Sequence, residues 1–224
     1  MKPLKIIETG DGSHTLFNEA LNETYHSTHG ALTESQHVFI KEGLSYYSDK
    51  NPDKKKISIL EIGFGTGLNA MLTLQAAIEK NLEIFYYTLE PYPVETEVIE
   101  KLNYKSLFEE TYQPYYNQLH ELPWEVENKV VDNFSIVKTT TGLENLSFSE
   151  QFDLVYFDAF APRKQPELWE VASLKNAITP LKAKGVLVTY CAMGAFKRNL
   201  KSLDVLVESI PGPPGKREMT RAIK

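Results

Sequence analysis

The sequence contains little cysteine and no long hydrophobic run. Cys191 is the single cysteine among 224 residues, which excludes an internal disulfide framework and a cysteine-based metal cluster. No stretch is long and apolar enough to suggest a membrane-spanning helix, and residues 1–14 lack the apolar core of a signal peptide. These absences predict a cytoplasmic protein that does not act at a membrane.

The sequence also has fewer basic than acidic residues. The chain has 24 Lys and Arg residues against 30 Asp and Glu residues, a formal net charge of −6, which argues against a nucleic-acid binder that relies on bulk electrostatics. Basic residues nevertheless gather toward the C-terminus, so a local basic patch stays open as an interpretation. The length and the 42% hydrophobic content favour one core with small additions.

The most informative stretch is residues 57–74, which is typical of a buried strand, a glycine turn and a helix. Its first part is apolar and β-branched, its middle holds Gly63, Gly65 and Gly67, and its last part is apolar at helical spacing. Glycines at such a turn let a ligand approach the backbone, and a helix start offers free N–H groups. The stretch predicts a nucleotide-like ligand, with a purely structural turn as the alternative.

The spacing of the glycines distinguishes between two cofactors. A dinucleotide fingerprint requires Gly-x-Gly-x-x-Gly, whereas here the third glycine comes one position early and Leu68 holds its place. The segment Glu-Ile-Gly-Phe-Gly-Thr-Gly instead resembles motif I of the class I S-adenosylmethionine-dependent methyltransferases, which implies a turn around the amino-acid part of that cofactor. The residues that would hold it are Glu61, Gly63, Phe64, Gly65, Thr66, Gly67 and Asn69.

Two later strands end in acidic residues. Glu90, followed by Pro91, closes an aromatic strand at the position from which a carboxylate can take both ribose hydroxyls, with a surface carboxylate as the alternative. Asp158 follows residues 152–157, which are mostly apolar. It would lie opposite the glycine turn and beside the methyl donor, because ligands collect at the carboxyl ends of parallel strands.

The expected fold is therefore α/β, a Rossmann-like class I methyltransferase with a mostly parallel seven-stranded sheet and an antiparallel C-terminal strand. Residues 1–55 are expected to form an N-terminal extension, a hairpin and a helix, packed on a core of residues 56–224. A helical insertion is expected at about residues 103–130. In related methyltransferases the turn after the third strand contacts adenine, and here Thr140 and Thr141 occupy it.

Two histidines in the expected extension, His26 and His29, could suggest a metal site. No Glu-x-x-His pair or cysteine completes a ligand set, so we expect no metal. The segment that contains Tyr25 and His26 is instead expected to line or cover the ligand pocket.

Several motifs together resemble one family. Glu-Thr-Tyr-His-Ser, Leu-Glu-Pro-Tyr-Pro, Asp-Ala-Phe-Ala-Pro, Pro-Glu-Leu-Trp and Gly-Lys-Arg-Glu-Met, with the glycine turn, are similar to the methyltransferase part of the MnmC family, which also occurs alone as MnmD. The resemblance spans nearly the whole chain. It implies N-methylation of the 5-aminomethyl group of 5-aminomethyl-2-thiouridine at the tRNA wobble position (U34), giving 5-methylaminomethyl-2-thiouridine, with S-adenosyl-L-methionine as the cofactor.

For that reaction, Asp158 is the catalytic candidate. A primary amine is mostly protonated near neutral pH, and a carboxylate can orient it and accept its proton. Phe160 would shape a dry wall on the cofactor side. Lys216 and Arg217 would hold the backbone of the anticodon stem-loop, with a solvated turn as the alternative. The expected substrate contacts are Tyr25, His26, Pro162, Lys216 and Arg217.

Members of the family with two domains also carry an FAD-dependent oxidase. This sequence has no second glycine fingerprint, so methyl transfer alone is expected, with functional coupling to the enzymes that make the aminomethyl precursor. A class I methyltransferase acting on a small amine or a protein is the alternative that the acidic net charge favours. A nucleotide-binding module without catalysis is disfavoured, because an acid at Asp158 adds nothing to mere cofactor retention.

Overall fold

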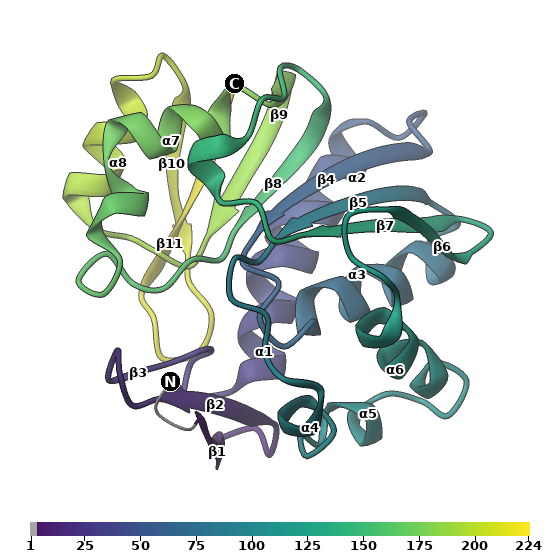
Figure 1. Ribbon diagram of the computed structural model, residues 1–224. Coiled ribbons are helices and arrows are strands. Elements are labelled where there is room, and N and C mark those ends of the chain that lie inside the picture. The colour runs from purple at the N-terminus through teal and green to yellow at the C-terminus, as the bar shows by residue number, and fades with distance from the viewer. Residues whose placement is uncertain (1–3) are drawn as a thin grey trace.

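Eight segments of the chain pair into one sheet in the computed structural model, which describes residues 4–224 (Figure 1). The order is β10-β11-β9-β8-β4-β5-β7-β6. Strands β9, β8, β4, β5 and β7 run parallel, and β11 runs antiparallel to β9. The bounds are β4 Lys56–Ile62, β5 Glu83–Leu89, β6 Glu127–Val131, β7 Phe134–Thr139, β8 Phe152–Phe157, β9 Leu181–Thr189, β10 Leu206–Pro211 and β11 Glu218–Ile223.

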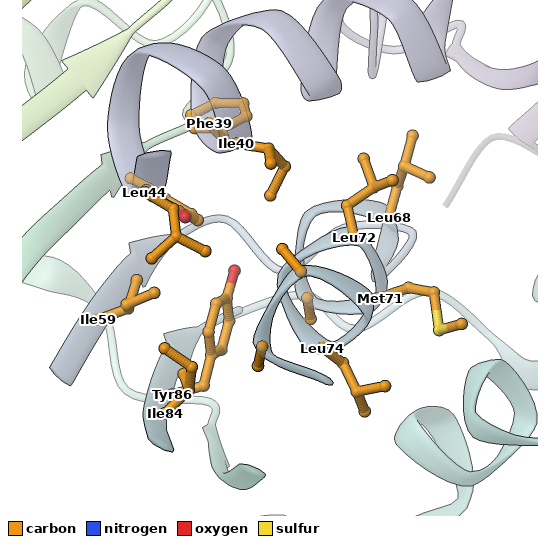
Figure 2. Packing of buried hydrophobic residues seen from close by; sticks show 14 of the residues in the cluster. Phe39, Ile40, Leu44, Ile59, Leu68, Met71, Leu72, Leu74, Ile84 and Tyr86 are labelled. Carbon is orange, nitrogen blue, oxygen red and sulfur yellow. The ribbon is translucent and has the colours of Figure 1, made fainter. Parts of the chain in front are cut away.

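Helices cover both faces of this sheet, because successive strand residues point to opposite faces and both faces are apolar. In β4, Ile57 and Ile59 join one buried cluster, whereas Leu60 and Ile62 join the other. Figure 2 shows side chains of the N-terminal helix, α3, β4 and β5 meeting in the first cluster. The main helices are α1 Ala31–Ser35, η1 Gln36–Ser45 (π-helical), α2 Tyr46–Lys50, α3 Leu68–Glu79, α7 Val171–Ile178 and α8 Gly194–Lys201.

The N-terminal part forms a separate small antiparallel sheet of β1 (Leu4–Glu8), β2 (His14–Asn18) and β3 (Glu23–Thr24). Strands β1 and β2 form the expected hairpin, and α1, η1 and α2 follow as one run of helix. Residues 1–3 of the expected extension lie outside the described residues. Within residues 4–224 no helix is long and apolar enough to cross a membrane.

The fold class is confirmed, but two details of the expectation are wrong. The sheet has eight strands rather than seven, because β6 pairs antiparallel with β7 at the edge. The end of the expected helical insertion, at about residues 103–130, belongs to β6 instead. The insertion contains the helices α5 Tyr104–Leu107 and α6 Gln113–Glu121, and α4 Thr96–Ile99 lies before it. Short 3-10 turns η2 (Leu143–Asn145) and η3 (Pro166–Trp169) complete the helices. An edge strand that carries charged side chains lacks the apolar run by which strands are recognised.

The loop between β10 and β11 reaches the N-terminal part of the chain (Figure 1). His37 Nε2 lies 2.9 Å from the carbonyl oxygen of Pro211, and Arg221 pairs with Glu42 at 3.3 Å. These contacts join the last two strands to the first helix. The N-terminal segment and the C-terminal hairpin therefore meet on the side of the sheet where β4 and β8 end.

Candidate active site

A large cleft opens at the carboxyl ends of β4, β5, β7 and β8. Its volume is about 2310 Å³, whereas a pocket for one small molecule usually has ~300–1,000 Å³. The glycine turn, the ends of these strands, residues 17–28 and the β10–β11 loop all contribute to the lining. The cleft can therefore hold a cofactor together with part of a second reactant.

The glycine turn between β4 and α3 is held between two close neighbours. Gly63 has φ +97°, and a Cβ there would lie 2.6 Å from the backbone oxygen of Asp158. Gly67 begins α3 with φ +71°, and a Cβ there would lie 2.8 Å from His120 Nε2. Both positions combine a left-handed backbone with a close approach, so only glycine fits without displacing a neighbour.

Helix α6 of the insertion fixes this turn through the carbonyl oxygen of Thr66. The Tyr116 hydroxyl donates to that oxygen at 3.0 Å, and His120 Nε2 lies 3.1 Å from it. Burial lowers the pKa of His120 to about 4, so the ring is neutral near pH 7. The buried Lys138 donates to the carbonyls of Leu119 and His120 at the end of α6. The insertion thus supports the cofactor turn from outside the cleft.

We expect Tyr116→Phe to lower affinity for S-adenosylhomocysteine severalfold and the free energy of unfolding by about 1 kcal/mol, because one hydrogen bond to the turn is lost. Calorimetry and denaturant titration measure the two effects. Tyr115→Phe, on the same helix, is the matched control, since no hydrogen bond of the Tyr115 hydroxyl occurs within residues 4–224. Equal affinities for the two variants would show that the Tyr116 hydrogen bond does not help to hold the glycine turn.

Glu61 is placed differently from the other predicted cofactor residues. It lies fully buried beneath the turn, where Thr88 Oγ1 donates to its Oε2 at 2.7 Å. Burial raises its pKa to about 8, so it is mostly protonated at neutral pH. Glu61 and Gly67 do not line the cleft, whereas the remaining predicted cofactor residues do. Glu61 therefore supports the turn from below.

Glu90 links the second strand to the glycine turn. Its carboxylate accepts hydrogen bonds from the N–H groups of Gly65, at 2.9 Å, and Tyr92, at 3.0 Å, and burial raises its pKa. Pro91 lines the cleft beside it. This arrangement holds a carboxylate at the mouth of β5, where hydroxyl groups of a nucleoside can reach it.

Thr140 and Thr141 also line the cleft, and the loop that carries them has a partner that the sequence did not reveal. Glu125 accepts hydrogen bonds from the backbone N–H of Thr140 at 2.8 Å and from Thr139 Oγ1 at 2.7 Å. Glu125 has φ +63°, a strained conformation for this residue type. Only the hydrogen bonds seen in the structure identify Glu125 as the residue that orders this loop.

Asp158 lies directly across from the glycine turn, as its strand position predicted. Asn69 Nδ2 donates to Asp158 Oδ2 at 2.8 Å, which orients the carboxylate from the first turn of α3. Burial, together with the charge of Glu34, raises the pKa of Asp158 to about 7, against the opposing effects of Asn69 and Lys216. A carboxyl group with a pKa near 7 can exchange protons at neutral pH.

The predicted substrate residues share the cleft with Asp158. The rings of Tyr25 and Phe160 meet edge to face at 5.0 Å, and Pro162 follows on the same wall. His26 is buried, with Nδ1 3.2 Å from Thr15 Oγ1, and burial lowers its pKa to about 4. His26 is therefore a neutral part of the wall near pH 7.

Lys216 and Arg217 are adjacent in sequence but differ in surroundings. The Arg217 side chain is 94% exposed at the rim, whereas Lys216 Nζ lies 2.5 Å from Glu34 Oε1 inside the cleft. Glu34 is buried and was not among the predicted site residues. A signal was present, because Glu34 falls between Ala31 and Val38 on the apolar stripe of its helix. An acid on such a stripe needs a buried partner.

Two buried polar atoms at the turn test whether the chain fits a cofactor. Thr66 Oγ1 and Asn69 Oδ1 have no hydrogen-bond partner among the described residues, and both residues line the cleft. Buried polar groups normally have partners, so these atoms suit the charged amino-acid part of a ligand. With Glu90 at the mouth of β5, the residues fit a nucleoside that carries an amino acid. Fold and cleft together define a class I methyltransferase.

The family follows from comparison with known proteins. A family profile described as S-adenosyl-L-methionine-dependent methyltransferase matches residues 102–224, more than half of the chain. The chain belongs to this family, and S-adenosyl-L-methionine is its cofactor. The crystal structure of CurJ carbon methyltransferase has 14% sequence identity and a TM-score of 0.52. The alignment covers 89% of this chain and 56% of the CurJ chain, and this likeness shows the fold alone.

Proteins with higher sequence identity to this chain than CurJ carry the name MnmC or MNMC2. The tRNA 5-methylaminomethyl-2-thiouridine biosynthesis bifunctional protein MnmC of Leptospira interrogans is 28% identical over 92% of this chain, and its counterpart in Cupriavidus metallidurans is 26% identical over 99%. These alignments span only 33% and 34% of the relatives, so the chain has about a third of their length. The crystal structure of MNMC2 from Aquifex aeolicus superposes with TM-score 0.82 at 28% identity, over 99% of this chain and 70% of the other.

Proposed function

We propose that this protein transfers a methyl group to the 5-aminomethyl nitrogen of 5-aminomethyl-2-thiouridine at the tRNA wobble position, giving 5-methylaminomethyl-2-thiouridine. The names of its relatives, which refer to tRNA 5-methylaminomethyl-2-thiouridine biosynthesis, support this choice of substrate. The observation that carries the proposal is the position of Asp158, oriented by Asn69 and facing a cleft with room for a second reactant. The proposal covers methyl transfer alone, with the aminomethyl precursor made by other enzymes.

Different residues of this chain would bind the cofactor, orient the amine and exclude water. Bound S-adenosyl-L-methionine supplies an electrophilic methyl group. Asp158 would accept a hydrogen bond from the amine, orient it and take up its proton, directly or through water. The edge-to-face pair of Tyr25 and Phe160, with Pro162, would exclude water from that wall. Glu90 would hold the nucleoside end of the cofactor.

Mass spectrometry of wobble nucleosides tests the proposal. The protein and S-adenosyl-L-methionine are incubated with tRNA that carries the aminomethyl nucleoside, and the expected product is heavier by one methylene unit at that nucleoside. Unmodified tRNA is the control. Transfer of the methyl group to a small amine or a protein, with none to this tRNA, would favour the alternative class I methyltransferase. A carboxymethylaminomethyl tRNA tests the second part of the proposal, since its conversion would reveal oxidase activity.

The exposed Arg217 offers a test of how the RNA is held. We expect Arg217→Glu to weaken tRNA binding about tenfold or more at low salt, because a phosphate contact at the rim becomes a repulsion. Lys55→Glu makes the same change of charge at an exposed position before β4, at the opposite end of that strand from the cleft. Filter binding in a salt series measures both, and equal losses would contradict a specific role for Arg217.

A further inference from the structure

Charged side chains from three separate elements line the same cleft. Glu34 comes from α1, Lys216 from the β10–β11 loop and Asp158 from the end of β8, and all three line the cavity. Lys216 Nζ lies 2.5 Å from Glu34 Oε1 and 4.0 Å from the centre of the Tyr190 ring. Nothing in the methyl-transfer reaction itself requires the Glu34–Lys216 pair.

Both members of the pair are held in place by further contacts. The backbone N–H of Ser27 donates to Glu34 Oε2 at 2.7 Å, so the second carboxylate oxygen is also occupied. The hydroxyl of Tyr190 donates to the carbonyl of Ala159, the residue after Asp158, at 2.8 Å. The Lys216 side chain is 32% exposed and that of Glu34 8%. The pair is therefore fixed between the N-terminal helix and the strand end that carries Asp158.

We propose that Glu34 and Lys216 are positioning residues for Asp158: Lys216 neutralises Glu34, so that Asp158 can ionise in the same cleft and accept the substrate amine. Only the role of the amine rests on the proposed function. Two carboxylates in one partly dry cavity cannot both ionise easily unless a cation compensates one of them.

The other titratable groups around Asp158 do not provide this compensation. Burial raises the pKa of Glu61 to about 8 and that of Tyr104 above its usual range, and burial also raises the pKa values of Tyr86 and Tyr190. These groups are mostly or fully neutral near pH 7, as is His26, which faces Glu34. Glu90 lines the same cleft, but its two oxygens are bound by backbone N–H groups. Among the described residues, Lys216 is the cation whose charge lowers the pKa of Asp158.

A titration of Asp158 tests the pair without substrate or cofactor. The protein is labelled with carboxyl-13C aspartate, and the Asp158 resonance is identified by its loss in Asp158→Asn. We expect Lys216→Met to raise the titration midpoint by about one pH unit, because Glu34 is no longer neutralised. Glu34→Gln should lower the midpoint, and the double variant should return it toward the value of the unaltered protein. Lys216→Arg should leave it nearly unchanged.

Arg221→Met is the matched control, because it removes other ion pairs of the hairpin, with Glu42 at 3.3 Å and Glu208 at 2.8 Å. None of these three residues lines the cleft. A midpoint that is the same in Glu34→Gln, Lys216→Met and the unaltered protein would overturn the inference. So would an equal shift in Arg221→Met, which would indicate general loosening of the hairpin. If Lys216→Met does not fold, the opposite shift in Glu34→Gln decides alone.

The same variants connect the pair to catalysis. With aminomethyl tRNA as substrate, the acid limb of the pH profile of kcat/KM should move with the Asp158 midpoint in each variant. If the unaltered protein transfers no methyl group to this tRNA, the proposed function fails, while the titration still decides whether the pair controls Asp158. A profile that stays fixed while the midpoint moves would overturn the catalytic part of the inference.

Discussion

Asp158→Asn is expected to lower kcat for methyl transfer by about 10²- to 10⁴-fold, the usual range for the loss of a positioned acid–base group. Asparagine keeps the shape of the side chain and can still contact Asn69, which donates to Asp158 Oδ2 at 2.8 Å in the structure. It cannot take up a proton or attract an ammonium group. Affinity for S-adenosylhomocysteine should change little, because the glycine turn and Glu90 are untouched.

Rapid-quench assays with radiolabelled methyl donor, alongside calorimetry with S-adenosylhomocysteine, separate these effects. The pH dependence adds a check. Since the pKa of Asp158 is raised to about 7, the ionised form increases as pH rises through 7, and the rate of the unaltered protein should rise with it. The asparagine variant should lack this limb. A variant with turnover within about twofold of the unaltered protein would show that Asp158 has no catalytic role.

Gly63→Ala should have the largest effect on cofactor binding of any single methyl addition in the turn. The new Cβ would lie 2.6 Å from the backbone oxygen of Asp158, and the residue would keep φ +97°. Backbone cannot yield as a flexible side chain can, so β4 and β8 must separate where the catalytic candidate begins. We expect the free energy of unfolding to fall by more than about 2 kcal/mol and cofactor affinity to fall at least about tenfold.

Gly12→Ala separates strain from collision. Gly12 also has a left-handed backbone, φ +81°, but an added Cβ there would meet no atom within 4 Å. It should therefore cost only the conformational strain, about 1 kcal/mol, and leave cofactor affinity unchanged. Denaturant titration and calorimetry on both variants give the comparison. If Gly63→Ala lowers stability and cofactor affinity no more than Gly12→Ala does, the close approach of the turn to β8 does not matter for cofactor binding.

Much of the fold could be read from local patterns. The strand at residues 152–157 is apolar except for Asp153, and such a run is typical of a strand that is buried on both faces. Glycine spacing and strand-end acids then placed Gly63, Glu90 and Asp158 around one cleft, and the structure brings all three to its lining. These features are encoded in a few consecutive residues, so no knowledge of distant contacts was needed.

Other features depended on partners that are remote in the chain. Strand β6 carries the charged residues Glu127 and Lys129, and it is a strand only because β7 offers it an edge. Glu61 belongs to the expected motif, yet the burial of its strand places it beneath the turn rather than in the cleft. Side-chain direction within a motif follows from which face of the sheet the strand presents.

The sequence alone determined the class of fold, the glycine turn and the strand-end acids, because periodicity, glycine placement and strand ends are local properties of the chain. The tertiary structure decided which charges surround Asp158. Glu34 and Lys216 are far apart in sequence and meet only because the first helix and the last hairpin pack against each other. Electrostatic coupling depends on distance and burial in three dimensions, so the charges around Asp158 could not be read from the order of residues.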